Sequence, residues 1–298
     1  MDLAGAASEP VALKVALHPS RSERVKREFR ARKRAVEAGL DFVPEPLFVD
    51  DENFPDVAVA TKFVEGRFPD DFNRDASRQL AACLARTHEV KFQPVADWRV
   101  LLNAHFNALE SLVRRIGKRP WGNPVLTGGF TSAFREAKRE AFARADLAGK
   151  APGFVGLTHG DVSDNFLVDS VGKLWLVDWE NSRVDDVVEE VVLVAIELGL
   201  AGAAERHFFE QYVRANPPVE AVDLRAARSA YDASVPLYLL CWDLEFAAAL
   251  PFCRGSVKSL SISLASSVSA LPDHFSHATK DALMRGTRAA AELLVKRA

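Results

Sequence analysis

A polar loop followed by a short hairpin, in the middle of the chain, constrains the fold more than any other segment. Residues 157–169 read LTHGDVSDNFLVD and residues 173–180 read KLWLVDWE. Apolar side chains alternate on both sides of a turn, which predicts two antiparallel strands. Such a ribbon places Asn165, just before its first strand, beside Asp178, just after its second. Asp161 lies on the preceding loop, so three oxygen-bearing side chains are expected to converge.

This convergence is typical of a phosphoryl-transfer centre that uses a metal-bound nucleotide. Positioning the acceptor oxygen and neutralising the phosphate charge dominate that chemistry, so few side chains are needed. We expect Asp161 to orient the acceptor hydroxyl and to accept its proton late in the reaction. Asn165 and Asp178 offer the oxygen ligands that Mg²⁺ prefers, and Glu180 is expected to assist.

A purely structural explanation of the same residues stays open. Loop aspartates usually cap turns, and Asn165 and Asp178 would then only begin and end strands. That explanation leaves the convergence of Asp161, Asn165 and Asp178 without a cause. The spacing therefore favours the metal site and the catalytic loop.

The composition is that of a globular chain. Its 298 residues are enough for about two domains, and 48% hydrophobic residues are enough for a buried core. A net charge of −3 gives no general attraction to nucleic acid or to anionic membranes, although residues 21–34 are locally basic. The three cysteines lack the spacing of a metal site or a disulfide framework. We find neither a secretion signal nor an apolar run of membrane-spanning length, so a cytoplasmic protein is expected.

The first part of the chain predicts a small sheet with one helix. Residues 11–17 are rich in apolar and β-branched side chains and contain Lys14, which predicts a strand. Residues 22–38 have helical periodicity, contain Glu28 and end at a glycine. Residues 47–49 and 57–64 are further predicted strands.

The rest of the chain is mainly helical. Amphipathic spacing and breakers predict helices at 77–88, 100–116, 131–144, 187–200, 203–215, 223–250 and 278–297, with a loop at 117–129. An α+β fold follows, with a small antiparallel-sheet lobe at residues 1–65 and a larger helical lobe at 66–298.

The order and spacing of these motifs resemble the aminoglycoside phosphotransferase and choline kinase family, whose members are relatives of the protein kinases in fold. The resemblance spans most of the chain. It rests on the strand Lys14, Glu28 in the sequence REF, a hinge-like KFVEG at 62–66, LARTH at 84–88, HGD at 159–161 with Asn165, and DWE at 178–180.

The resemblance implies a bilobal, protein-kinase-like fold and an enzyme that uses ATP and Mg²⁺. Lys14 would contact the α- and β-phosphates while Glu28 holds it in place. The backbone of the hinge would bind adenine through three residues, Lys62, Phe63 and Val64. His159 would brace the catalytic loop. A strand lysine is otherwise most often only an exposed edge residue.

Three departures from the family pattern carry further expectations. Thirteen residues precede Lys14, so we expect the two strands and the glycine-rich turn that cover the phosphates to be shortened or missing. Asn165 follows Asp161 by four residues, where the family has five, so the catalytic loop is one residue short. Glu190 follows Asp178 by twelve residues, at a position where the family usually carries Asp.

Two functions are compatible with this pattern. The first is an ATP- and Mg²⁺-dependent phosphotransferase that acts on a hydroxyl of a small molecule, such as an aminoglycoside, an amino alcohol or a sugar-like compound. The alternative is a catalytically silent relative that binds a ligand or a protein partner in the same cleft. The shortened N-terminus favours the alternative, whereas the retained Asp161, Asn165 and Asp178 favour the enzyme. Neither a nucleic acid nor a membrane is expected as a partner.

Overall fold

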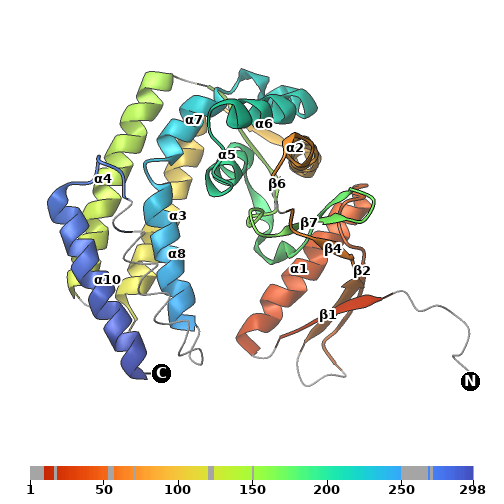
Figure 1. Ribbon diagram of the computed structural model, residues 1–298, viewed down its shortest axis with the longest axis horizontal. Coiled ribbons are helices and arrows are strands. Elements are labelled where there is room, and N and C mark those ends of the chain that lie inside the picture. Colours follow the sequence, from red (N-terminus) through yellow and green to blue (C-terminus); the bar gives the residue numbers. More distant parts are fainter. Residues whose placement is uncertain are drawn as a thin grey trace, which may run out of the picture. The chain divides into compact units, whose positions relative to one another are not determined.

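The computed structural model describes residues 10–16, 19–52, 57–69, 72–119, 124–149, 151–249, 268 and 271–297 (Figure 1). The chain forms two compact units. The first comprises residues 1–95 and 154–222, and the second comprises residues 96–153 and 223–298. The lobe boundary expected after residue 65 falls within the first unit. Residues 1–9, which belong to the segment expected to be shortened, lie outside the described residues.

Short strands and helices alternate in the first unit. Its strands are β1 (Val11–Val15), β2 (Pro46–Asp50), β3 (Ala58–Lys62), β4 (Gly66–Arg67), β5 (Gln93–Val95), β6 (Gly153–Thr158), β7 (Phe166–Asp169), β8 (Leu174–Leu176) and β9 (Arg183–Asp186). Its helices are α1 (Pro19–Glu37), α2 (Arg74–Glu89), the 3-10 turn η1 (Trp179–Asn181), α5 (Val187–Glu197), α6 (Gly202–Ala215) and the 3-10 turn η2 (Pro217–Ala221). The strands form three-stranded sheets in the orders β1-β3-β2, β4-β7-β8 and β5-β6-β9.

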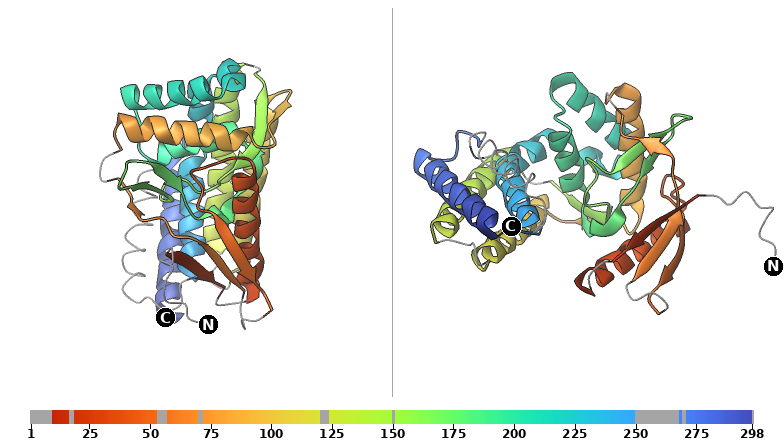
Figure 2. Two further views of the ribbon diagram at one scale, coloured as in Figure 1. Left: turned by 90° about the vertical axis from the view of Figure 1, so that its right-hand side faces the viewer. Right: turned by 60° about the horizontal axis from the view of Figure 1, so that its bottom comes forward.

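Helix α1 packs on one face of the β1-β3-β2 sheet, as the left-hand view of Figure 2 shows. The contact is apolar, because Ala16, Val25, Val57 and Val59 are buried together with Phe29 against them. Side chains alternate along a strand, so Lys14 shares the face of Ala16 that α1 covers. The register places Lys14 opposite Val59 of the central strand. The sheet therefore presents Lys14 to the helix that carries Glu28.

The predicted hairpin is confirmed. Strands β7 and β8 are antiparallel, with Phe166 opposite Leu176 and Val168 opposite Leu174. The Val177 N–H donates to the Asn165 carbonyl at 2.9 Å, which extends the ladder one step beyond the strands. The sequence thus correctly predicted that Asn165 lies beside Val177, the residue before Asp178.

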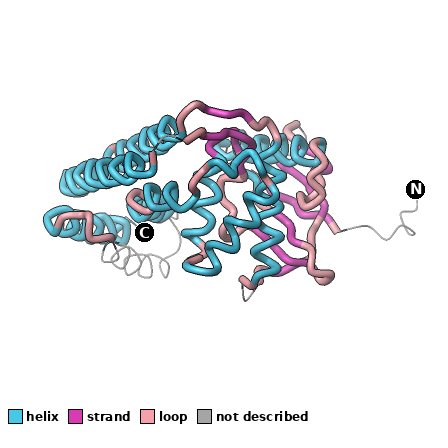
Figure 3. The backbone as a smooth tube through the Cα atoms, turned by 90° about the horizontal axis from the view of Figure 1, so that it is seen from above, coloured by secondary structure: helices cyan, strands magenta, loops and turns pink. Residues whose placement is uncertain are grey.

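Long helices build the second unit, drawn in cyan in Figure 3. They are α3 (Trp98–Gly117), α4 (Pro124–Ala148), α7 (Leu224–Tyr231), α8 (Val235–Ala249) and α10 (His277–Arg297). Helix α4 is central, since it packs against α3, α7, α8 and α10. Within the ranges that the structure describes, no helix combines the length and the apolar character of a membrane-spanning segment.

Two sequence predictions for this unit were wrong. The predicted loop at 117–129 ends early, because α4 begins at Pro124, a residue whose missing N–H costs nothing in a first helical turn. Gly129 is then helical, and it allows close packing, since a Cβ there would lie 3.1 Å from the α10 backbone at Ala282. The predicted helix at 223–250 is two helices, because Pro236 cannot donate to the preceding turn and a continuous helix would require that bond.

Gly156 of β6 generates a prediction about stability. A Cβ at this position would lie 2.2 Å from the carbonyl oxygen of His88, a backbone atom that cannot move aside. Gly156→Ala should therefore lower the free energy of unfolding by about 3 kcal/mol, the upper range of an overpacking cost. Denaturant unfolding of the purified variant measures this change.

Gly128→Ala is the matched control. A Cβ at Gly128 meets no atom within 4 Å, and this residue lies within α4. The control should be neutral or stabilising by up to about 1 kcal/mol, because alanine has the higher helix propensity. Equal stability of the two alanine variants would contradict the close packing of β6 against α2.

Candidate active site

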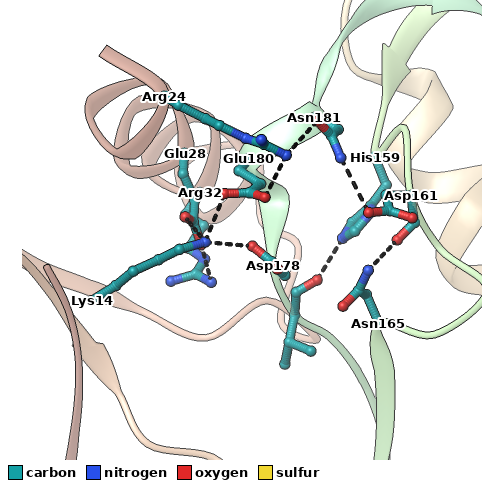
Figure 4. A network of polar contacts seen from close by, with 11 residues as sticks. Lys14, Arg24, Glu28, Arg32, His159, Asp161, Asn165, Asp178, Glu180 and Asn181 are labelled. Carbon is teal, nitrogen blue, oxygen red and sulfur yellow. Dashed lines mark hydrogen bonds and ion pairs between the residues drawn. The ribbon is translucent and has the colours of Figure 1, made fainter. Parts of the chain in front are cut away.

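A lysine held by three carboxylates forms the first part of the site (Figure 4). The Lys14 ammonium contacts Glu28 at 2.8 Å, Asp178 at 2.7 Å and Glu180 at 2.9 Å. Burial alone would favour neutral lysine, but the hydrogen bonds that the ammonium donates to the three carboxylates outweigh it and raise the pKa of Lys14 above its ordinary value. Lys14 is therefore a permanent cation in this site.

Glu28 is the most deeply buried member of the cluster. Its side chain is 1% exposed, and its second oxygen binds Arg32 at 2.6 Å, one helical turn further along α1. A buried carboxylate needs such partners, because an unpaired charge out of water costs several kcal/mol. The pairing of Lys14 with Glu28 that the resemblance implied is present in the structure.

The backbone at Asp178 directs its carboxylate toward Lys14. Asp178 has φ 58° and ψ 61°, a left-handed conformation that aspartate tolerates better than most residues. The η1 turn that follows brings Glu180 to the same place. Oxygen atoms of Glu28, Asp178 and Glu180 lie within 4.8 Å of one another. Three hard oxygen donors of this kind suit a divalent cation.

Asp161 lies on the loop between β6 and β7. The side-chain amide of Asn181 donates to Asp161 Oδ2 at 3.1 Å. Surrounding protein excludes part of the solvent and raises the pKa of Asp161; the nearby Asp178 and Asp164 also raise it, while His159 and the Asn181 hydrogen bond oppose the shift. Asp161 is nevertheless exposed to solvent.

Asn165 stays attached to the loop that carries Asp161, although four residues separate the two where five were expected from the family. Its amide nitrogen donates to the Asp161 carbonyl oxygen at 2.8 Å, and its N–H donates to the Val162 carbonyl at 2.9 Å. The shorter loop thus closes as a tight turn. The Asp178 carboxylate contacts Lys14, beside Glu28 and Glu180. These contacts group Asp178 with Lys14, and they group Asn165 with Asp161.

His159 is buried beneath the loop. Its Nε2–H donates to the Val177 carbonyl at 2.7 Å, and its ring lies edge-on to Trp179 with the centroids 4.8 Å apart. Burial lowers the pKa of His159, which keeps the ring neutral at pH 7. The side chain therefore joins the loop to the end of the hairpin, as expected of a bracing residue.

Glu190 holds the same loop from α5. Its carboxylate accepts hydrogen bonds from the N–H groups of Gly160 at 2.5 Å and of His159 at 3.2 Å. It also accepts from His88 Nε2 at 2.7 Å, and His88 Nδ1 lies 2.8 Å from the Tyr212 hydroxyl. Burial opposes ionisation, but the bonds to His88 and Gly160 outweigh it and lower the pKa of Glu190. Glu190 therefore binds the loop backbone from a position where the family usually has aspartate.

The hinge-like segment is partly engaged with its own backbone. The Lys62 N–H donates to the Glu45 carbonyl at 2.8 Å, and the Phe63 N–H donates to the Pro10 carbonyl at 3.0 Å. These two donors are thus occupied in the structure.

Sequence reasoning missed three residues that face the site. Arg24 precedes Glu28 by one helical turn, so helical spacing could have identified it. Asn181 ends the η1 turn, and no sequence signal distinguishes it. Glu197, at the end of α5, has its pKa raised to about 7, chiefly by burial and despite a hydrogen bond from Ser163.

Comparisons with solved structures show what the fold is similar to. A choline/ethanolamine kinase family protein from Mesorhizobium loti is 17% identical, with 95% of this chain and 87% of that chain covered and a TM-score of 0.57. The choline kinase LicA from Streptococcus pneumoniae is 16% identical, with 97% and 88% covered and a TM-score of 0.54. APH(2")-IIa, solved as a complex with streptomycin and ATP, is 15% identical over 78% of each chain, with a TM-score of 0.52. These likenesses confirm the predicted kinase-like α+β fold.

A family comparison goes beyond the fold. No curated protein matches the sequence significantly. The model of the phosphotransferase enzyme family, APH, matches residues 3–228, a range that includes Lys14, the catalytic loop and the hairpin. Because this match covers well over half of the chain, the chain belongs to the phosphotransferase enzyme family, as its sequence motifs predicted.

Proposed function

We propose that this phosphotransferase transfers the γ-phosphoryl group of ATP to a hydroxyl of a small molecule and that it requires Mg²⁺. One observation carries the proposal: Lys14, paired with the buried Glu28, contacts Asp178 at 2.7 Å, while Asp161 stands on the adjoining loop with its pKa raised. A cation for phosphates, carboxylates for a metal and a solvent-reached carboxylate for the acceptor are thus present together.

The nucleotide is assigned to the Lys14 side of the site. A lysine ammonium is a strong phosphate ligand, and the ion pair with Glu28 keeps this ammonium in place. We propose that the Val64 N–H and the backbone of Lys62 to Val64 bind adenine. The complex of APH(2")-IIa with streptomycin and ATP supports ATP as the donor.

The side chains at this end of the hairpin fit Mg²⁺. Asp178 and Glu180 offer carboxylate oxygens, and Asn165 offers an amide oxygen whose nitrogen is already bound to the loop. When bound, the ion would neutralise charge on the phosphate oxygens. We propose Asp178 and Asn165 as its protein ligands, with Glu180 in support.

Asp161 is proposed to act on the acceptor. Its carboxylate would accept a hydrogen bond from the hydroxyl, orient that oxygen toward the phosphoryl group and take the proton as the new bond forms. Glu190 and His159 would keep the loop in place during this step. The choline kinase and aminoglycoside phosphotransferase similarities favour an amino alcohol, an aminoglycoside or a sugar-like acceptor.

A catalytically silent relative that binds a ligand or a protein partner remains the second candidate. One observation favours it: Lys14 itself occupies the carboxylates that a metal ion would use. The two candidates differ in whether nucleotide and metal bind together, and in whether ATP is consumed.

We propose the cytoplasm as the location of the protein.

Nucleotide binding separates the two candidates. Saturating ATP with Mg²⁺ should raise the Tm of the wild type, because a ligand at about 100 times its Kd stabilises the folded state by about 2.7 kcal/mol. Lys14→Met should remove most of this gain, since it removes the phosphate contact. Differential scanning fluorimetry measures both, with AMP and Mg²⁺ alone as reference ligands. A wild-type Tm that does not respond to ATP and Mg²⁺ would favour the silent relative.

Asp161 can be tested in an ATP-consumption screen over hydroxyl acceptors. Asp161→Asn should lower kcat by about 10²- to 10⁴-fold, the usual contribution of a positioned base, while the Tm gain with ATP and Mg²⁺ is kept. Asp164→Asn, on the same loop, is the matched control and should retain turnover near that of the wild type. Equal kcat in Asp161→Asn and the wild type would remove Asp161 from its assigned role.

A further inference from the structure

Asn181 and Arg24 form a chain of hydrogen bonds that ends on Asp161 (Figure 4). The Asn181 amide nitrogen donates to Asp161 Oδ2 at 3.1 Å. The Asn181 amide oxygen accepts from Arg24 Nη2 at 3.3 Å. The same Arg24 nitrogen contacts Glu180 at 2.5 Å, and the other oxygen of Glu180 binds Lys14 at 2.9 Å.

The chemistry of the two partners fixes the orientation of the Asn181 amide. A guanidinium only donates hydrogen bonds, and an ionised carboxylate only accepts them. The amide oxygen must therefore face Arg24 and the amide nitrogen must face Asp161. An asparagine is suited to this position, because its short side chain accepts at one atom and donates at the other.

We propose that Asn181 is a positioning residue for Asp161 and that Arg24 sets the orientation of the Asn181 amide. The inference rests on the proposed function, in which Asp161 acts on the acceptor hydroxyl. The contact occupies Oδ2 of Asp161, so Oδ1 is the oxygen left to meet the acceptor hydroxyl. The orientation of the base is thereby linked to helix α1.

The same chain of contacts also joins Asp161 to the ion cluster around Lys14. Arg24 and Glu28 lie one turn apart on α1, and Glu180 bridges Arg24 to Lys14. Arg24 is 43% exposed, so its ion pair with Glu180 is screened and contributes little to stability. The ion pair matters because it fixes the position of Arg24, and a small displacement of a reacting group can cost about 100-fold in rate.

The charges around Asp161 explain why one amide contact matters. Asp164, Asp178 and Glu197 face it from the loop, the hairpin and α5, and each repels its negative form. The Asn181 N–H donates to this carboxylate and holds it at Oδ2. Loss of the Asn181 contact would leave the repulsion unopposed there, and the carboxylate would turn away from the acceptor hydroxyl.

Comparison of kcat with KM tests the proposal. In Asn181→Ala, kcat should fall about 10- to 100-fold, because Asp161 loses the contact that orients it. The KM for ATP should stay unchanged, since neither Lys14 nor Asp178 is altered. A purely structural role of Asn181 would lower the Tm and leave kcat at the wild-type value.

Arg24→Ala keeps Asn181 in place and guards against a folding defect in the first variant. It should lower kcat by a smaller factor than Asn181→Ala does, and Arg24→Lys should recover part of this loss because lysine still donates to the Asn181 amide oxygen. Arg27→Ala is the matched control, on the same helix with an exposed side chain, and should leave kcat unchanged.

The outcomes separate the two claims. A wild type that turns over, with Asn181→Ala at the same kcat, would overturn the positioning role and leave the proposed function intact. A wild type without turnover on any acceptor would overturn the proposed function and the inference with it.

Discussion

The ion cluster around Lys14 joins elements that are far apart in the sequence. Strand β1 supplies the ammonium, helix α1 supplies Glu28, and the segment after β8 supplies Asp178 and Glu180. Glu28 is almost completely buried, so removing its partners would leave an uncompensated charge, at a cost of about 3–5 kcal/mol. The contacts of Lys14 with Asp178 and Glu180 are partly exposed and screened. The position of α1 over the sheet therefore depends mainly on the apolar contact and on the pairing of this one glutamate.

A second, separate support holds the loop that carries Asp161. Glu190 binds two consecutive backbone N–H groups of the loop, and His88 and Tyr212 continue the network into α2 and α6. These groups are buried and mutually hydrogen-bonded, so they specify one loop conformation. His159 then joins the loop to the hairpin through the Val177 carbonyl. The segment that carries Asp161 and the segment that carries Asp178 are thus fixed against each other.

The sequence predicted those parts of the site that depend on backbone periodicity. Alternation of apolar residues located the hairpin and its register, and helical spacing located Glu28 on the helix that follows Lys14. The direction of the Asp178 carboxylate was beyond this reasoning, because it depends on a left-handed backbone at one residue. The contacts of Arg24 and Asn181 were missed for a similar reason, since side-chain rotamers and a 3-10 turn bring them together. The break between α7 and α8 was missed because apolar spacing continues across it.

Charge balance explains how Lys14 can pair with carboxylates and still be available for phosphate under the proposed function. Lys14, Arg24 and Arg32 are paired with Glu28, Asp178 and Glu180, so the cluster is neutral without a ligand. A nucleoside triphosphate carries more negative charge than one divalent cation neutralises. Under the proposed function, the ammonium of Lys14 therefore has reason to turn from Asp178 and Glu180 toward the phosphates, while Glu28 keeps hold of it. The lysine in the carboxylate cluster is then a cation held ready for phosphate, and its pairing without ligand is no obstacle to nucleotide binding.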